Sequence, residues 1–410
     1  MIFLIVKCHL SSSEKIDNLN IKLNYNNKIA LDDNKVVIND LNEILLIPID
    51  RLTSLQYLTF GCDFNKPLSN RLDKLTFLQH LTFGDYFNQP LSNSLDKLTC
   101  LQCLTFGFYF NQPLCNSLDK LISLQYLTFG ASFNKPLSNS LDRLISLQYL
   151  FFCDFFDQPL SNSLDKLTLL QCLTFSRDFN QLLSNSLNKL TSLQYLTFDL
   201  YFNQPLYNSL DKLTCLQHLT FGYNFNQPLS NSLNKLTSLQ YLTFDLYFNQ
   251  PLYNSLDKLT CLQHLTFGYN FNQPLCNSLV KLTSLEYLAL GYNFNQPLDL
   301  LSNIKHLVLD CNNQYIIDNL HNNIEELILG YEFNLELDNL PSSIKKIIIK
   351  NKYYGVELNN LPSSVEYIGL PLEYDKKILN IPKNLKEIKC NKKYEFINDF
   401  SNCEVSFIEW

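Results

Sequence analysis

Most of this 410-residue chain follows a single period of 23 residues. Eleven phenylalanines, from Phe64 to Phe294, succeed one another at that interval with no insertion or deletion. A fixed repeat of this size is the signature of architectures in which each unit packs mainly on its two neighbours. Residues 183–229 also recur unchanged as residues 229–275, so whole units have been duplicated. The chain must therefore fold into a structure that grows by stacking.

Each unit contains two spacings of apolar residues. Residues 55–60 (LQYLTF) alternate in a way typical of a short strand, with Tyr57 and Thr59 on the face opposite its apolar side chains. Residues 68–75 place three leucines at i, i+4 and i+7, which is helical spacing, and Asn70 stands where a helix cap would. We therefore predict an α/β solenoid of the leucine-rich-repeat type, with one short parallel strand plus a helical turn per 23-residue coil.

The period shortens to 20–21 residues beyond Gly291, where five further strands are expected. The predicted organisation is an N-terminal cap at 1–50, eleven regular repeats at 51–299, shorter degenerate repeats at 300–390 and a C-terminal cap at 391–410. Residues 1–50 lack the repeat, and their short β-like runs at 36–38 and 44–47 are expected to cover the first coil. Both ends of a solenoid need such closure.

Stacking turns every repeated residue into a row. We expect the phenylalanines to form core and the asparagines after them to satisfy turn backbone groups through their amides. A second asparagine row, from Asn70 to Asn277, is expected to cap the helical turns. Adjacent lysine and aspartate rows largely cancel in charge, which favours a solvated face over a phosphate or acidic-partner site. The members of the structural ladder are Phe64, Asn65, Phe87, Asn88, Phe110, Asn111, Phe225 and Asn226.

The open, concave strand face is the candidate binding surface. Its glutamine is kept in ten of eleven regular coils and its threonine in nine, while the position between them varies among Tyr, His and Cys. Variation in one exposed row of an otherwise copied unit indicates an interaction surface, and tyrosine is enriched in binding hot spots. The alternative is that tyrosine favours strands and stacks along the sheet. The candidate protein-binding residues are Tyr57, His80, Tyr126, Tyr149, Tyr195, His218, Tyr241, His264 and Tyr287; Cys103 and Cys172 fill the two remaining positions.

The F-N-x-P-L core of each unit resembles the FNIP repeat, a leucine-rich-repeat relative found in amoebae and their large DNA viruses. Seven copies read FNQP, two FNKP, one FDQP and one FNQL, and the L-P-S-S segments at 340–343 and 361–364 are similar to that family's linker. The resemblance spans roughly residues 50–390 and implies a binding protein. Viral members often carry an N-terminal F-box that docks on a ubiquitin-ligase adaptor. Residues 1–50 are Asn-rich and strand-like, without the expected helical pattern.

Composition and motifs disfavour other classes of function. The net charge of −7 argues against nucleic-acid binding, and no apolar run is long enough to span a membrane. Cys100 and Cys103 form a C-x-x-C with no second pair, and we find no P-loop, G-x-G-x-x-G or G-x-S-x-G. We therefore expect no enzyme, no metal and no cofactor. The 13 cysteines are odd in number and exchange with serine and tyrosine between copies, which favours reduced thiols in the cytoplasm (of a host, if the protein is viral).

Three functional hypotheses follow from these patterns. The first is a scaffold that binds an unknown protein partner, possibly of the host, through the concave strand face. The second is a substrate receptor of a ubiquitin ligase, which needs a divergent docking module in residues 1–50. The third is a duplicated repeat protein with no dedicated partner, since the 47-residue copy is unchanged.

Overall fold

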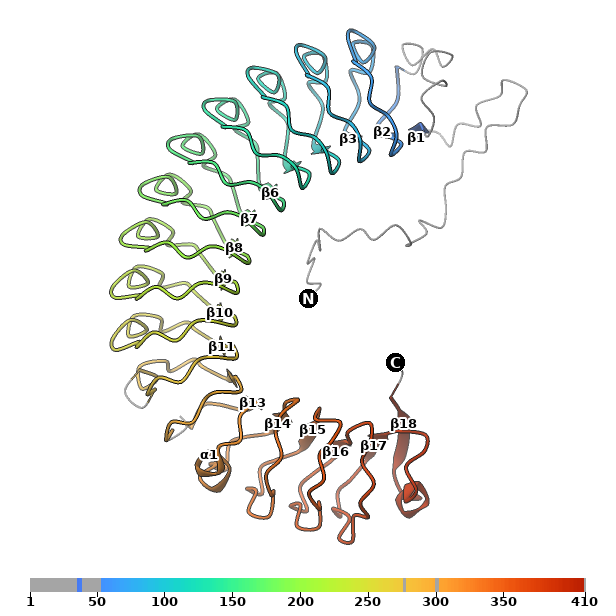
Figure 1. The fold of residues 1–410 in the computed structure, drawn as a ribbon, viewed down its shortest axis with the longest axis vertical. Coiled ribbons are helices and arrows are strands. Elements are labelled where there is room, and N and C mark those ends of the chain that lie inside the picture. The colour runs from blue at the N-terminus through green and yellow to red at the C-terminus, as the bar shows by residue number, and fades with distance from the viewer. Residues whose placement is uncertain (1–34, 39–52, 276–277, 299–301, 409–410) are drawn as a thin grey trace, which may run out of the picture. The chain divides into compact units, whose positions relative to one another are not determined.

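The computed structural model describes residues 35–38, 53–275, 278–298 and 302–408, and the chain divides into two compact units, residues 1–216 and 217–410. Both units are built from the same kind of coil. In each, the strands lie along one side of the coils and the turns along the other (Figure 1). The remainder of the predicted N-terminal cap, including residues 44–47 and any docking module, lies outside the described residues.

The first unit is a ladder of parallel strands in strict register. Leu58, Leu81 and Leu104 are register partners on successive coils, and the same sequence offset continues to the last strand of the unit. The first strand, within the predicted cap, pairs in parallel with the second. These strands are β1 (Lys35–Ile38), β2 (Tyr57–Phe60), β3 (His80–Thr82), β4 (Cys103–Thr105), β5 (Tyr126–Thr128), β6 (Tyr149–Phe152), β7 (Cys172–Phe175) and β8 (Tyr195–Phe198).

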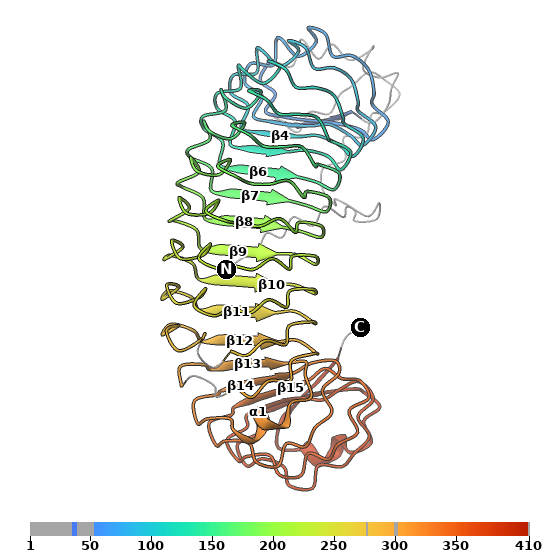
Figure 2. The ribbon, with the colours of Figure 1, turned by 60° about the vertical axis from the view of Figure 1, so that its left-hand side comes forward.

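The second unit begins with the same kind of ladder and then changes its period. Among the first four strands of this unit, register partners are 23 residues apart in sequence. Among the later strands they are separated by fewer residues. Figure 2 shows the strands of this unit running in one direction. They are β9 (His218–Phe221), β10 (Tyr241–Phe244), β11 (His264–Phe267), β12 (Tyr287–Leu290), β13 (His306–Leu309), β14 (Glu326–Leu329), β15 (Lys346–Ile349), β16 (Tyr367–Gly369), β17 (Glu387–Cys390) and β18 (Glu404–Phe407).

Leucines and two rows of phenylalanine fill the coils. Phe83, at the strand end, and Phe87, in the following turn, stack with centroids 4.1 Å apart and are both buried. Each ring also stacks on its counterpart in the next coil, as Phe87 does on Phe110 at 6.1 Å. Phe64, Phe110 and Phe225 are likewise buried. Such offset ring pairs add to the free energy gained from burying the rings themselves.

The asparagine row bonds coil to coil. The backbone N–H of Asn88 donates to Oδ1 of Asn65 at 3.0 Å, and that of Asn111 donates to Oδ1 of Asn88 at 2.9 Å. Asp157 takes one place in the row, and its Oδ1 accepts from the backbone N–H of Asn180 at 2.9 Å. A carboxylate can replace the amide there because the position is used as an acceptor. Asn226 extends the row in the second unit by accepting from the N–H of Asn249 at 2.9 Å.

The stacked parallel solenoid predicted from the sequence is confirmed, and its helical turn takes the form of consecutive i→i+3 turns. In the first regular coil the N–H of Asp73 donates to the carbonyl of Asn70, and that of Leu75 to the carbonyl of Leu72. A segment this short forms too few bonds to offset the cost of nucleating an α-helix. Within the described residues, helix is assigned only at α1 (Gln314–Asp318) and, as 3₁₀, at η3 (Ile397–Phe400).

The second asparagine row participates in these turns through its backbone carbonyls, as Asn70 does. In two coils its side chain bonds another side chain, with Oδ1 of Asn185 accepting from Nδ2 of Asn188 and Oδ1 of Asn231 from Nδ2 of Asn234. Just before it, a row of residues adopts a left-handed backbone with φ of 43–48°. The members are Ser69, Ser92, Cys115, Ser138, Ser161, Ser184, Tyr207, Ser230 and Tyr253.

Candidate interaction surface

The variable row stands at the first position of each strand, on the face opposite the core. Tyr57, Tyr126 and Tyr195 are exposed, whereas the leucine that follows each of them is buried. The glutamine before the row helps to fix the coils. The carbonyl of Gln56 accepts two N–H groups of the next coil, those of Gln79 and His80, both at 2.9 Å. Because these backbone hydrogen bonds recur from coil to coil, the side chains that vary lie in one row.

The rings of the row stack on one another along each unit. In the first unit Tyr57 stacks on His80 at a centroid distance of 4.3 Å, and Tyr126 stacks on Tyr149 at 4.4 Å. In the second unit Tyr241 stacks on both His218 and His264, each at 4.3 Å. The last pair, His264 with Tyr287, is tilted at 5.2 Å. A stacked ring turns its edge and polar tip outward, so much of this surface offers hydroxyl and imidazole edges and hides ring faces.

Stacking also partly buries the histidines. Burial lowers the pKa of His80, of His218 and of His264 below the ordinary value of 6.5. The neighbouring imidazole of His264 contributes to the lowered pKa of His218. These rings are therefore neutral at pH 7, and the row is an uncharged aromatic surface there.

Two cysteines interrupt the row in the first unit. Cys103 is the register partner of His80 and Tyr126, and Cys172 is the register partner of Tyr149 and Tyr195. Burial raises the pKa of the Cys172 thiol to about 11, and it also raises that of Cys103. Neutral thiols of this kind behave as small apolar side chains and are poor nucleophiles.

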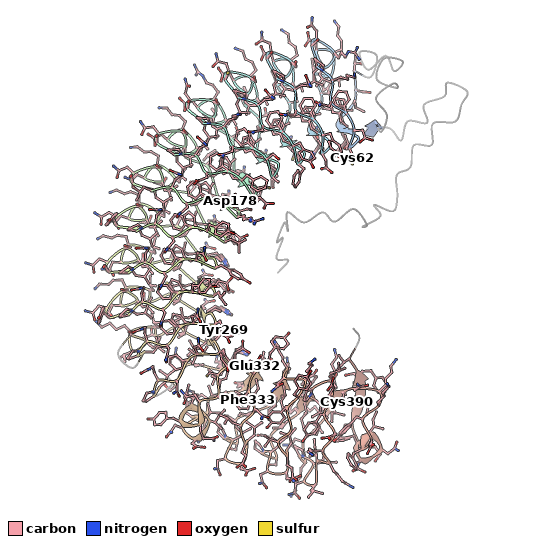
Figure 3. The ribbon with its side chains drawn as sticks, viewed as in Figure 1. Cys62, Asp178, Tyr269, Glu332, Phe333 and Cys390 are labelled. Carbon is pink, nitrogen blue, oxygen red and sulfur yellow. The ribbon has the colours of Figure 1, made fainter. Side chains whose placement is uncertain are left out.

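A second group of aromatic side chains lies just beyond the strand ends. Tyr86 stacks on Tyr109 at 5.0 Å, and Tyr269 stacks on Tyr292 at 4.8 Å. Figure 3 shows Asp178 in the first unit and Tyr269 in the second on the strand side of their own units. The exposed members of this aromatic rim are Tyr86, Tyr109, Tyr201, Tyr223, Tyr247, Tyr269 and Tyr292.

The rim of the first unit also carries carboxylates. Asp154, Asp178 and Asp199 follow the ends of β6, β7 and β8. Burial raises the pKa of Asp178, and the nearby charges of Asp154 and Asp157 raise it further. Burial likewise raises the pKa of Asp199, with a contribution from Asp154. Arg177 lies 3.6 Å from Asp178 and offsets part of this negative charge.

Sequence reasoning missed a ladder of alternating charge in the second unit. It occupies the position that is glutamine in the regular coils, and its side chains pair from one coil to the next. The pairs are Glu286 with Lys305 at 2.8 Å, Glu325 with Lys345 at 2.9 Å and Glu366 with Lys386 at 2.6 Å. The alternation of sign from each coil to the next was visible in the sequence. Lys305, Lys345 and Lys386 are therefore already paired with carboxylates.

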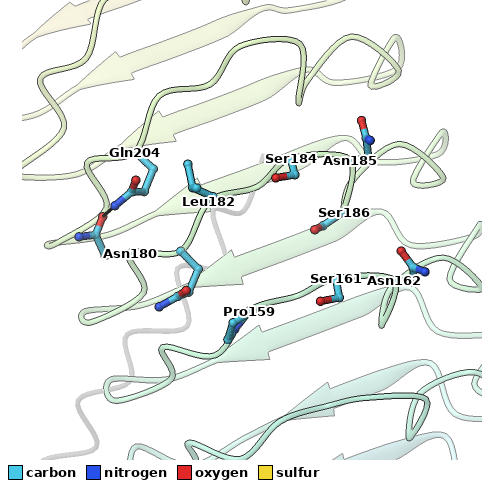
Figure 4. A pocket seen from close by; sticks show the side chains of 10 residues that line it. Pro159, Ser161, Asn162, Asn180, Leu182, Ser184, Asn185, Ser186 and Gln204 are labelled. Carbon is cyan, nitrogen blue, oxygen red and sulfur yellow. Dashed lines mark hydrogen bonds between the residues drawn. The ribbon is translucent and has the colours of Figure 1, made fainter.

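A groove on the turn side has a volume of about 690 Å³ (Figure 4). It lies where Leu182 replaces the usual proline, and asparagine, glutamine and serine side chains line most of it. Its amides belong to the ladder between coils. Nε2 of Gln181 donates to Oδ1 of Asp157 at 2.8 Å, and Nε2 of Gln204 donates to Oδ1 of Asn180 at 3.1 Å. The amides of Gln181 and Gln204 at this groove are thus already used in the ladder between coils.

The described strand rows bring no catalytic constellation together. Among the described residues, no group of three or more His, Cys, Asp or Glu side chains is arranged to hold a metal ion. The same residues include no helix of the length and apolarity needed to cross a membrane. Cys100 is exposed while Cys103 is partly buried in the row, so the C-x-x-C pair belongs to two different surfaces.

Comparison with known proteins places the chain among repeat proteins. Residues 312–352 match the model of the FNIP Repeat family, and no curated protein matches. The crystal structure of CroV588, a circular LRR protein of a giant virus, is similar with a TM-score of 0.58 and 28% identity, covering 88% of this chain and 58% of its own. This chain therefore spans little more than half the length of that protein.

Two more distant solved structures share the fold. An LRR protein of Leptospira interrogans matches with a TM-score of 0.59 and 21% identity over 91% of this chain and 100% of its own. The Toll–Spatzle complex of Drosophila matches with a TM-score of 0.57 and 16% identity over 89% of this chain and 51% of that chain. The family match falls in the shorter coils, around the F-N-L-E-L-D-N-L-P-S-S segment, and confirms the resemblance there. The chain is a leucine-rich-repeat solenoid that carries an FNIP repeat at residues 312–352.

Proposed function

We propose that the protein is a non-enzymatic scaffold that binds a protein partner through the strand face of its first unit. The observation that carries this proposal is the variable row, because it changes type from coil to coil while its neighbours on the strand are kept. The neutral histidines and the net charge of −7 favour a protein over a nucleic acid. The fold is also that of Toll in its complex with Spatzle, which is consistent with a binding role.

The reducing cytoplasm, of an amoebal host if the protein is viral, is the location we propose. Cys100, Cys215 and Cys261 stand where other coils have serine, and all three are exposed. Exposed thiols that exchange freely with serine suit a compartment in which disulfides do not form. The ubiquitin-ligase alternative depends on residues 1–50, of which only β1 is described.

Site-specific photo-crosslinking tests the binding face. A photoreactive phenylalanine derivative is placed at Tyr126, on the strand face, or at Lys120, on the turn side, and each full-length protein is irradiated in amoebal lysate. We expect one reproducible protein to be captured from position 126 and not from position 120. Capture of the same protein from position 120 alone would move the interface to the turns. Capture of a ubiquitin-ligase adaptor would favour the second hypothesis.

A further inference from the structure

The two cysteines leave two gaps in the ring row of the first unit. We call them ring gap 1, where Cys103 stands between His80 and Tyr126, and ring gap 2, where Cys172 stands between Tyr149 and Tyr195. All six residues are on consecutive strands, β3 to β8, of one unit. The strands that hold the cysteines, β4 and β7, lie in the same parallel ladder as β6 and β8 (Figure 2).

The second unit shows what a filled position looks like. Tyr241 fits between His218 and His264 with 4.3 Å to each ring centroid. The two outer rings of a ring gap are therefore about 9 Å apart, twice the spacing of neighbouring strands. An aromatic ring inserted midway would lie roughly 4.5 Å from both, which is within the preferred range for stacked aromatic pairs. A thiol side chain is too short to occupy that space.

One ring beside each gap is well exposed, Tyr126 at 39% and Tyr195 at 40%, while His80 and Tyr149 are partly exposed, as Tyr241 is. The floor of each gap is apolar, because Cys172 and Cys103 are partly buried neutral thiols. Phe151 adds to the apolar surface beside ring gap 2, since it is the register partner of two threonines on the adjacent strands. An aromatic side chain would find ring faces on both sides and an apolar base.

The spacing of the two gaps specifies the form of the ligand. Cys103 and Cys172 are three strands apart, which corresponds to about 14 Å along the ladder. An extended peptide advances about 3.3–3.4 Å per residue and directs alternate side chains to the same side, so residues i and i+4 are roughly 13–14 Å apart on one face. Two aromatic side chains at that interval match both gaps at once.

The charge around ring gap 2 specifies the ligand further. Asp154, Asp178 and Asp199 crowd the ends of the three strands that form it, and the single cation Arg177, which acts on Asp178 and Asp154, offsets only part of this negative charge. A cation on the ligand would relieve this crowding, while a chain of phosphates would increase it. A single-stranded nucleic acid, which could also supply planar groups, is disfavoured for that reason.

We infer that ring gaps 1 and 2 receive two aromatic side chains of an extended partner peptide, four residues apart in its sequence, with a Lys or Arg next to the one in ring gap 2. This inference rests on the proposed protein-binding role of the same strand face. It adds a sequence pattern for the partner, aromatic-x-x-x-aromatic with a basic residue next to one of the two aromatic residues.

Selection from a random library tests the pattern without knowledge of the natural partner. Phage displaying random twelve-residue peptides are selected on the immobilised full-length protein, and the spacing of aromatic residues in the enriched clones is counted. We expect enrichment of aromatic pairs at i, i+4 over pairs at i, i+3, with Lys or Arg next to one member of the pair. Failure to enrich any peptide, or enrichment of a different spacing, would overturn the inference.

Three matched variants then locate the binding site of the best peptide. Cys103→Tyr and Cys172→Tyr fill the gaps with the residue that other strands carry, and each is expected to weaken binding at least tenfold in a fluorescence anisotropy titration. Cys100→Tyr makes the same change three residues away, at an exposed position outside the row, and should leave the affinity unchanged. Cys103→His, which introduces the residue that β3 carries, provides a second filled gap if the tyrosine variant melts at a lower temperature.

The outcomes separate this inference from the proposed function. If the gap-filled variants bind the peptide as tightly as the wild type, the ring-gap inference is wrong. Crosslinking from position 126 would still support a partner on the strand face. If crosslinking from position 126 is lost while the peptide still binds and Cys103→Tyr weakens that binding, the ring-gap inference stands and the proposed protein partner is rejected. If a ten-nucleotide oligothymidine binds tightly and displaces the peptide, the ligand of the ring gaps is a nucleic acid and the peptide inference is overturned.

Discussion

Nine described residues that are not glycine adopt a left-handed backbone in the turns of the regular coils. A side chain there places Cβ close to a carbonyl oxygen, which costs roughly 1–2 kcal/mol relative to the right-handed conformation. Most of the nine are serine, but two are large and exposed, Tyr207 at 69% and Tyr253 at 77%. The strain is tolerated because the buried leucines on either side of the turn hold it in place.

Replacing one of these tyrosines with glycine should stabilise the protein. Tyr253→Gly removes the steric cost and loses little contact, and the greater freedom of glycine in the unfolded chain offsets only part of the gain. We expect the free energy of unfolding to rise by about 0.5–1 kcal/mol, measured by urea denaturation. Tyr223→Gly, at an exposed turn position outside the left-handed row, is the control and should be neutral or destabilising.

The stacked histidines should make stability depend on pH. Burial lowers the pKa of His264 in the folded protein below 6.5, so the unfolded chain binds more protons just below that pH. The full free energy of unfolding should therefore be reached above about pH 6.5, and it should fall as the pH drops towards the pKa of the folded protein. In His264→Tyr the decrease in melting temperature between pH 7.5 and pH 5.5 should be smaller than in the wild type. An unchanged slope would show that the buried imidazole is not responsible.

At the scale of the coil, the phenylalanine stack joins each coil to both of its neighbours. Phe110 has no exposed surface and contacts Phe87 and Phe133 in the adjacent coils, as well as Phe106 in its own. Phe110→Ala should cost about 3–5 kcal/mol, because it leaves a cavity that the neighbouring coils cannot close. Phe108→Ala, two residues away but exposed, should change stability by less than about 0.5 kcal/mol in the same denaturation assay. Equal effects would contradict the burial pattern.

Glycine after the strand allows two coils to approach closely. A Cβ on Gly107 would overlap the carbonyl oxygen of Gly84 in the preceding coil, so no side chain fits there. Other coils have Cys153 or Ser176 at the same position, and there the N–H of Ser176 donates to the carbonyl of Phe152 at 3.0 Å. In the coil of Ser176 the ladder thus continues one residue beyond the strand.

At the scale of the whole molecule, identical coils imply that pairs can be removed. Deleting residues 230–275 takes out two complete coils of 23 residues and rejoins Leu229 to the sequence that naturally follows Leu275. Every remaining coil then meets a neighbour with the same contacts, so we expect a folded protein whose melting temperature changes by about 5 °C or less. Deleting residues 230–264 removes one and a half coils and should give an unfolded or aggregated product by circular dichroism.

The sequence predicted the stacking, the strand positions and the buried rows because these follow from period and alternation. Leu58 and Phe60 had to point inward once Tyr57 pointed outward. The form of the turn was beyond that reasoning, since leucines at i, i+4 and i+7 satisfy a helix and a run of i→i+3 turns equally well. The ring gaps were also invisible as gaps. Cys103 and Cys172 read as simple exchanges until the register placed them between stacked rings.

The composition of the strand row has a consequence for how such a protein changes over generations. Tyrosine differs from histidine, and from cysteine, by a single base in the genetic code, so one point mutation can open or close a position in the row. Because the coils themselves are copied whole, as residues 183–229 have been, each duplication spreads an existing arrangement of open and filled positions along the ladder. The exposed row can therefore diversify without any change to the leucines and phenylalanines that keep the chain folded.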